Sequence, residues 1–279
     1  MKKALLGVLL CLSLAVFAFS GGFSIKVNGG ANFLMGGDYN AAVEDANAEW
    51  QASAWTVGTE LETLNMGWNF GAEFIYNITD QMGLGLGVGY LMASNESTIN
   101  LSLTPFTQSY TFTPSASIIP ITLNFHYFMP VGETMNIHFT AGPGLYISSF
   151  SFEDRWQVPL LLTDLTETFE PDGVMGFGFQ GGLGIEFALS PSISLCLDVL
   201  GRMANISGLT GGATLAGTIF GIPGSVSATG LTLYYYEEGG YSNITISDTL
   251  PSGGGISNAR EASISLSGVA AQFGIKINI

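Results

Sequence analysis

The chain has 279 residues, and its 22 Asp and Glu residues outnumber its 7 Lys and Arg residues, which gives a formal net charge of −15. This balance excludes nucleic acid as a partner, because binding to phosphates requires clustered Lys and Arg side chains. Glycine is abundant at 38 residues, aromatic residues make up 12% of the chain, and charged residues make up only 10%. Such a composition suits strands that meet lipid on one side.

The first twenty residues have the pattern of a cleaved secretory signal peptide. Two lysines precede an apolar run, and small residues allow cleavage after Ser20. The apolar run is shorter than the roughly 20 residues that a spanning helix needs, so we favour cleavage over a membrane anchor. Residues 21–279 are then expected to form a single domain, with Cys196 as the one remaining cysteine and no internal disulfide.

Beyond the signal peptide, apolar residues alternate with glycine and polar residues, and this period of two predicts β-strands. The cleanest run has Gly83, Gly85, Gly87 and Gly89 on one face and apolar side chains on the other. Most runs have about the 9–11 residues that a tilted strand needs to cross a bilayer. We predict eight strands, at residues 23–27, 68–76, 83–90, 121–129, 137–147, 177–189, 193–203 and 269–279.

The ionisable residues of these runs decide between a membrane barrel and a soluble sandwich. If Phe, Leu and Ile face lipid, every ionisable side chain in the runs faces the other way. A lipid-facing Lys or Arg near the bilayer midplane would cost about 2–4 kcal/mol, which explains the segregation. We therefore predict an all-β fold, a closed antiparallel up-and-down transmembrane β-barrel. Its lumenal residues would be Lys26, Glu73, His126, His138, Glu186, Asp198, Arg202 and Lys276.

The connections between the predicted strands are alternately short and long. Turn-forming residues predict tight turns at 77–81, 130–134 and 189–192, and long external loops are expected near 38–65, 94–115, 151–173 and 205–261. Outer-membrane barrels have this asymmetry, and an even strand count places both termini in the periplasm.

Two features complicate this topology. Residues 231–236 and 241–246 form a predicted hairpin that we place outside the membrane; its insertion would give a ten-stranded barrel, the alternative. Pro120 and Pro143 lie inside predicted strands, where we expect bulges or bends.

Several stretches carry a family resemblance, namely residues 77–90, 119–127, 142–146, 195–202 and the closing strand to Ile279. Their pattern resembles the small outer-membrane β-barrel superfamily that includes the OmpA, OmpX, OmpW and opacity-type barrels. The resemblance implies a place in the bacterial outer membrane, insertion by the barrel-insertion machinery, and contact with outer-membrane lipid and lipopolysaccharide. Barrels of this kind usually end on Phe, whereas this chain ends on Ile279.

The candidate site is the lumenal face. We expect Lys26, Glu73, Glu186, Asp198, Arg202 and Lys276 to form a paired network that plugs the lumen, because an unpaired buried charge is strongly unfavourable. The alternative is a narrow pore lined by these charges. His126 and His138 flank the 130–134 turn and should be cross-strand neighbours. Two imidazoles could hold a metal or relay protons, but we favour space-filling hydrogen bonding.

The sequence favours a structural or surface-interaction role in the cell envelope, without catalysis, cofactor or metal. A narrow passive channel for small polar or amphipathic solutes is the alternative. A lipid A-modifying enzyme is disfavoured, because its nucleophile and base would have to reach the lipid face near the outer rim. Residues 176–181 match the G-x-G-x-x-G pattern, but the strand alternation continues through them, so we expect no nucleotide site.

Overall fold

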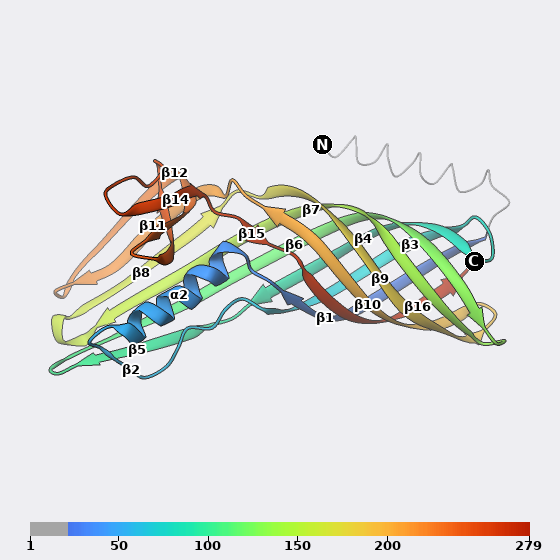
Figure 1. Ribbon diagram of the computed structural model, residues 1–279, viewed down its shortest axis with the longest axis horizontal. Coiled ribbons are helices and arrows are strands. Elements are labelled where there is room, and N and C mark those ends of the chain that lie inside the picture. Colours follow the sequence, from blue (N-terminus) through green and yellow to red (C-terminus); the bar gives the residue numbers. More distant parts are fainter. Residues whose placement is uncertain (1–21) are drawn as a thin grey trace.

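The computed structural model describes residues 22–279, so the expected signal peptide at residues 1–20 lies outside the described residues. The described chain is mostly antiparallel β-structure, as the alternating sequence predicts. Figure 1 shows an elongated molecule, with the C-terminus near one end and the helix α2 towards the other.

One half of the molecule is a ring of antiparallel strand pairs. The ladder leads from β1 through β3, β4, β6, β7, β9, β10 and β16, and the pairing of β16 with β1 returns it to its start. The eight strands of the ring are β1 (Phe23–Leu34), β3 (Met66–Asn77), β4 (Met82–Ser94), β6 (Phe106–Val131), β7 (Met135–Val158), β9 (Val174–Ser190), β10 (Ile193–Ile206) and β16 (Gly268–Asn278).

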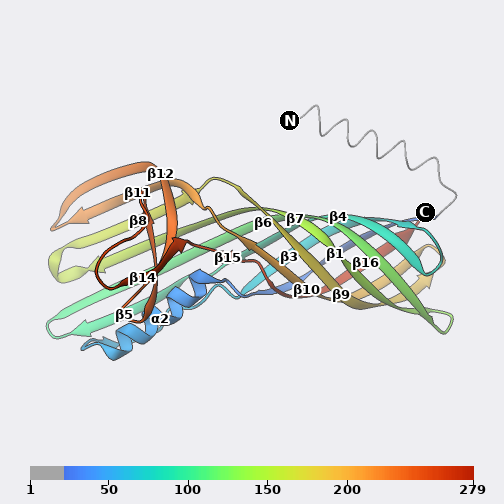
Figure 2. The ribbon, with the colours of Figure 1, turned by 45° about the horizontal axis from the view of Figure 1, so that its top comes forward.

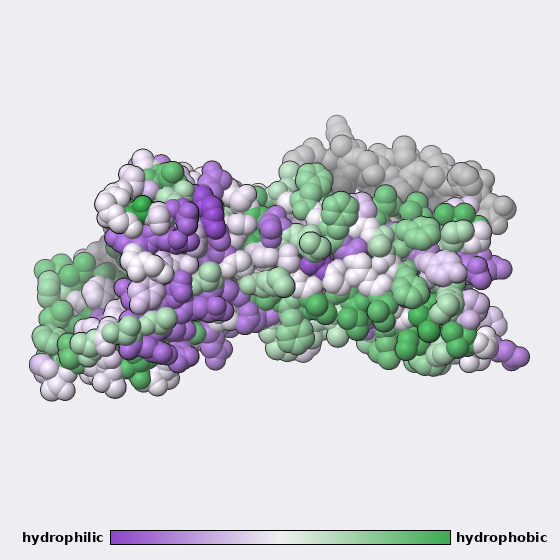
Figure 3. All heavy atoms as spheres, viewed as in Figure 1, coloured by the Kyte–Doolittle hydropathy of each residue, from purple (hydrophilic) through white to green (hydrophobic). Residues whose placement is uncertain are grey.

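Along much of the ring strands, buried side chains alternate with exposed ones. Along β4 the glycines are buried or half-buried, whereas Leu84, Leu86 and Val88 are exposed. The exterior of the ring is therefore apolar, and Figure 3 shows hydrophobic residues gathered over this half of the molecule. Short connections join β3 to β4, β6 to β7 and β9 to β10 at the end of the ring near the C-terminus (Figure 1).

The other half of the molecule, which we call the extension, is built by the segments expected to be long loops. There β6 and β7 continue past the ring, and most of the remaining chain forms further strands beside them. The added strands are β2 (Thr56–Val57), β5 (Ser97–Leu103), β8 (Thr163–Pro171), β11 (Thr210–Ile219), β12 (Ile222–Glu238), β13 (Tyr241–Ser247), β14 (Ile256–Glu261) and β15 (Ile264–Ser265). A single 3-10 turn, Pro159–Leu161, joins β7 to β8.

The predicted hairpin at residues 231–246 is present in the extension as the pairing of β12 with β13. It lies outside the ring of eight strands.

The expected loop at residues 38–65 contains a helix that the strand pattern did not predict, α2 (Asp38–Ala52). Ala and Glu, both strong helix formers, make up much of it. Tyr39 and Val43, one turn apart, are buried in the apolar core of the extension, which includes Phe150 and Leu233. The helix lies along the sheet in both ribbon views (Figure 2). Among residues 22–279, no helix is long and apolar enough to cross a membrane.

Pro120 and Pro143, where the sequence predicts bulges or bends, interrupt the ladder without changing its register. Between β4 and β6, pairing stops after Val88↔Ile121 and resumes at Leu91↔Ile118, around Pro120. Between β6 and β7 there is a similar gap opposite Pro143. Proline has no backbone N–H to donate, so a local gap is the expected consequence.

Candidate functional site

The structure buries all eight side chains that the sequence assigns to the lumen. Their exposed fractions lie between 2% for the two histidines and 8% for Glu73 and Arg202. They come from seven of the eight ring strands; β4 contributes glycines instead. The ring therefore has ionisable side chains on its inner face and apolar side chains on its outer face.

A three-residue cluster centred on Asp198 crosses this interior. Lys26 Nζ lies 2.6 Å from Asp198 Oδ2, and His138 Nε2 lies 2.6 Å from Asp198 Oδ1. The three residues belong to β1, β10 and β7, and neither contact joins neighbouring strands. These contacts therefore span the ring interior.

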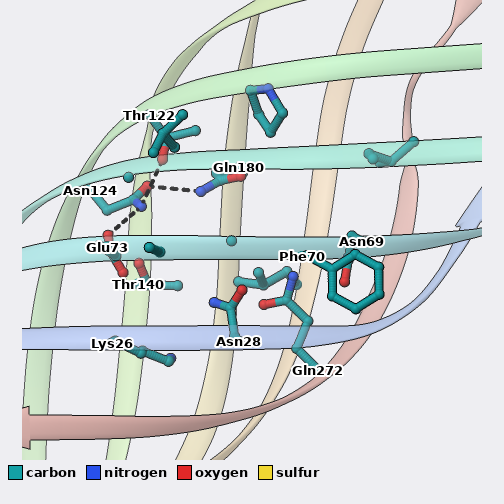
Figure 4. A pocket seen from close by; sticks show the side chains of 18 of the residues that line it. Lys26, Asn28, Asn69, Phe70, Glu73, Thr122, Asn124, Thr140, Gln180 and Gln272 are labelled. Carbon is teal, nitrogen blue, oxygen red and sulfur yellow. Dashed lines mark hydrogen bonds between the residues drawn. The ribbon is translucent and has the colours of Figure 1, made fainter.

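Two further contacts join strands across the ring interior. Lys276 Nζ donates to Glu186 Oε2 at 3.0 Å and lies 4.2 Å from the centroid of the Phe128 ring. His126 Nε2 lies 3.0 Å from Glu73 Oε1, and Asn124 Nδ2 donates to the same oxygen at 2.6 Å. Gln180, whose amide donates to Asn124, extends this network across β7 (Figure 4).

Glycines of the intervening strands make room for these contacts. A Cβ on Gly85, in β4, would lie 2.3 Å from Glu73 Oε1 and 2.7 Å from His126 Nε2. A Cβ on Gly184, in β9, would lie 2.3 Å from Asp198 Oδ1. The absence of side chains at these glycines therefore leaves the space in which the charged groups meet.

The two histidines are not direct cross-strand partners, which corrects the sequence-based expectation. His126 is in register with Thr140, and His138 is in register with Phe128. The Phe128 ring lies 5.8 Å from the His126 ring and 5.9 Å from the His138 ring, measured between centroids. Each imidazole contacts a different carboxylate, so the pair is divided between two clusters.

Arg202 also differs from the expectation of a fully paired network. Among residues 22–279, no carboxylate oxygen lies within the 4.0 Å salt-bridge distance of its guanidinium. Its Nη1 donates to Asn32 Oδ1 at 3.4 Å, and its Cζ lies 5.6 Å from the centroid of the Tyr146 ring. It borders a cavity of about 70 Å³ inside the ring.

No group of three His, Cys, Asp or Glu side chains in the described part of the chain is arranged to hold a metal ion. Cys196 is a buried free thiol. Residues 176–181 lie within β9 rather than between a strand and a helix, so the phosphate-binding geometry of the G-x-G-x-x-G pattern is not formed there.

Comparison with known proteins gives a family for the chain. Two solved structures are similar: the outer membrane protein OprG from Pseudomonas aeruginosa (12% identity, 93% of this chain and 96% of that chain covered, TM-score 0.40) and a major outer membrane protein from Thermus thermophilus (13%, 92% and 99%, 0.37). A comparison with curated proteins found no match. A family model described as "Outer membrane protein beta-barrel domain" matches residues 4–223. The chain therefore belongs to the outer membrane protein β-barrel domain family.

Proposed function

We propose that residues 22–279 form an eight-stranded barrel that spans the bacterial outer membrane, with a plugged lumen and a structural or surface-interaction role in the envelope. The extension would stand outside the cell, and both termini would lie on the periplasmic side after removal of residues 1–20. No catalysis is part of this proposal.

The exterior of the ring supports the membrane-spanning part of the proposal. Apolar side chains such as Val27, Leu197 and Phe273 are about half exposed there, whereas the ionisable residues assigned to the lumen are at most 8% exposed. In water, such an apolar belt would be costly, while in a bilayer it meets hydrocarbon.

The proposal of a plugged lumen rests on the contacts between charged and imidazole side chains across the ring interior. The contacts of Asp198, Glu186 and Glu73 each bridge two strands with another strand between them. Hydrated ions could pass only if these contacts opened. Separating a buried pair leaves uncompensated charges, which costs about 3–5 kcal/mol.

The extension supports the surface-interaction part. It holds α2 and the strands beyond the ring, and Figure 3 shows hydrophilic residues concentrated over its base. An Arg260–Asp38 ion pair, with Nη1 2.8 Å from Oδ2, ties β14 to α2. A folded domain of this kind offers a partner a fixed surface, unlike a flexible loop.

Conductance in a planar bilayer tests the plug. The purified protein should give no stable unitary conductance, because the interior is bridged. Asp198→Asn, which removes the carboxylate between Lys26 and His138, should give measurable current. Asp164→Asn, at an exposed ion pair with Arg155 in the extension, is the matched control and should behave as wild type. A reproducible unitary conductance in the wild-type protein would overturn the plug in favour of the channel.

Epitope accessibility on intact cells tests the orientation. A short tag can be inserted after Gly254 in the extension or after Gly132 in the β6–β7 turn, because a Cβ at either glycine meets nothing within 4 Å. Antibody should bind the tag at Gly254 on intact cells and the tag at Gly132 only after the outer membrane is opened. The reverse pattern would refute the proposed orientation.

A further inference from the structure

Arg202 differs from the other buried cations of the ring in having no counter-charge. Lys26 has a carboxylate oxygen at 2.6 Å and Lys276 has one at 3.0 Å. Arg202 is only 8% exposed, and its Nε has no hydrogen-bond partner within residues 22–279. A guanidinium removed from water without an opposite charge is destabilising, so an anion bound beside Arg202 would stabilise the barrel.

The carboxylates of the ring interior are already engaged elsewhere. Asp198 contacts Lys26 and His138, and Glu186 contacts Lys276. Glu73 is held by His126 and by the amide of Asn124. The chain itself therefore leaves Arg202 without an ionic partner at the position where its side chain borders the cavity.

The cavity beside Arg202 also presents polar groups that lack partners. Its lining includes Asn69, Thr140 and Gln272. Both polar atoms of the Asn69 amide, the Thr140 hydroxyl and Gln272 Oε1 are buried and make no hydrogen bond within the described chain. Figure 4 shows Asn69, Asn28 and Gln272 gathered at one end of the cavity and the Glu73–Asn124 pair at the other. Amide and hydroxyl donors beside a guanidinium are the groups that bind an anion.

We propose that this cavity is a binding site for a compact monovalent anion, of the size of a halide or formate, with Arg202 as its counter-charge. The cavity of about 70 Å³ has room for a compact anion, because a site that holds one water molecule needs only about 10–15 Å³ on this measure. The anion sits at the Asn69 end, away from the carboxylate of Glu73. The Asn69 amide donates to it, and Arg202 supplies the charge.

Bromide is the probe for the first experiment, because its anomalous scattering identifies it in a crystal of the wild-type protein. We expect a bromide peak within contact distance of the Arg202 guanidinium. A cavity that holds only water, or bromide found only at exposed side chains, would overturn the site. This measurement needs no substitution, so it does not depend on the folding of a variant.

Unfolding in detergent at constant ionic strength, with chloride or formate exchanged for bulky gluconate, is the second experiment. The compact anions should raise the wild-type midpoint by about 2–4 °C once the site is filled. Arg202→Gln should lose this shift, Arg202→Lys should keep part of it, and Arg155→Gln, at an exposed position in the extension, should keep all of it. An equal shift in Arg202→Gln and wild type would refute the assignment.

The anion site and the plugged lumen can fail separately. An occupied site in a barrel that carries no current supports both proposals. A current-carrying barrel with bromide at Arg202 overturns the plug alone, and a silent barrel without bromide overturns the anion site alone.

Discussion

A partly buried pair of carboxylates makes the stability of the extension dependent on pH. Asp154 in β7 is directly in register with Glu167 in β8. Burial and, to a lesser extent, the nearby carboxylates of Glu167 and Glu153 together raise the pKa of Asp154 to about 8. Burial also raises the pKa of Glu167. In the folded state these groups therefore hold protons that the unfolded chain releases.

Proton linkage gives the direction in which the free energy of unfolding changes with pH. Between the ordinary pKa of 3.8 and the folded-state pKa of about 8, the unfolded chain binds fewer protons at Asp154. The free energy of unfolding therefore falls as pH rises through this range and is constant above it. One pKa unit corresponds to about 1.4 kcal/mol, so a rise from pH 5 to pH 9 should cost at most about 4 kcal/mol. Asp154→Asn keeps the shape of the side chain but removes the ionisable carboxyl group. It should therefore remove most of the pH dependence of the free energy of unfolding.

Urea unfolding at pH 5 and pH 9, followed by tryptophan fluorescence, measures the effect. Trp156 lies two residues along the same strand face as Asp154, with its ring 6.4 Å from that of Tyr110. The wild-type midpoint should fall at pH 9, and that of Asp154→Asn should stay nearly constant. Asp164→Asn is the matched control: its carboxyl pKa is lowered by Arg155, so it should not remove the loss at pH 9. Equal midpoints of the wild-type protein at the two pH values would refute the reasoning.

Two further predictions concern the ring interior, both measured as the temperature at which the barrel loses its resistance to SDS on a gel. Glu186→Gln leaves the Lys276 ammonium buried without its carboxylate and should destabilise the barrel by about 3–5 kcal/mol; adding Lys276→Met should recover part of the loss, and no recovery would argue against the pair. Gly85→Ala should cost about 1–3 kcal/mol, because its Cβ would lie 2.3 Å from Glu73 Oε1. Gly212→Ala, with 3.7 Å to the nearest atom, is its control; an equal effect of both would contradict the packing argument.

The sequence predicts the ring interior well, because the period of two separates lipid-facing from inward positions without knowledge of the pairing. Lys26 and Glu186 illustrate this: parity alone places both side chains inside. Contacts need register, and register depends on turn geometry that the sequence leaves open. The two histidines are therefore offset by one pleat from the expected pairing, with Phe128 between them.

The extension is the part that the sequence predicts least. Strands such as β11, rich in Thr, Gly and Ala, lack a regular apolar face of the kind that marks the ring strands. The strand β11 pairs with β8, which is distant in the sequence, and with β12, which follows it after a turn. Pairing with these strands, rather than the local sequence pattern, therefore determines that β11 is a strand. The helix α2 has only a weak apolar stripe, because Tyr39 and Val43 are among its few large buried residues. The secondary structure of these segments is therefore determined by their tertiary contacts.

The uninterrupted course of β6 and β7 has a mechanical consequence. Their ladder begins at Val131↔Met135, beside the turn, and still holds at Ser109↔Gln157, far into the extension. Because the same two strands run through both halves, we expect the ring and the extension to tilt together as a rigid body. A force applied to the far end of the extension would be transmitted along the paired strands to the ring. The direction in which the extension presents its surface to a partner is therefore fixed by the direction of β6 and β7.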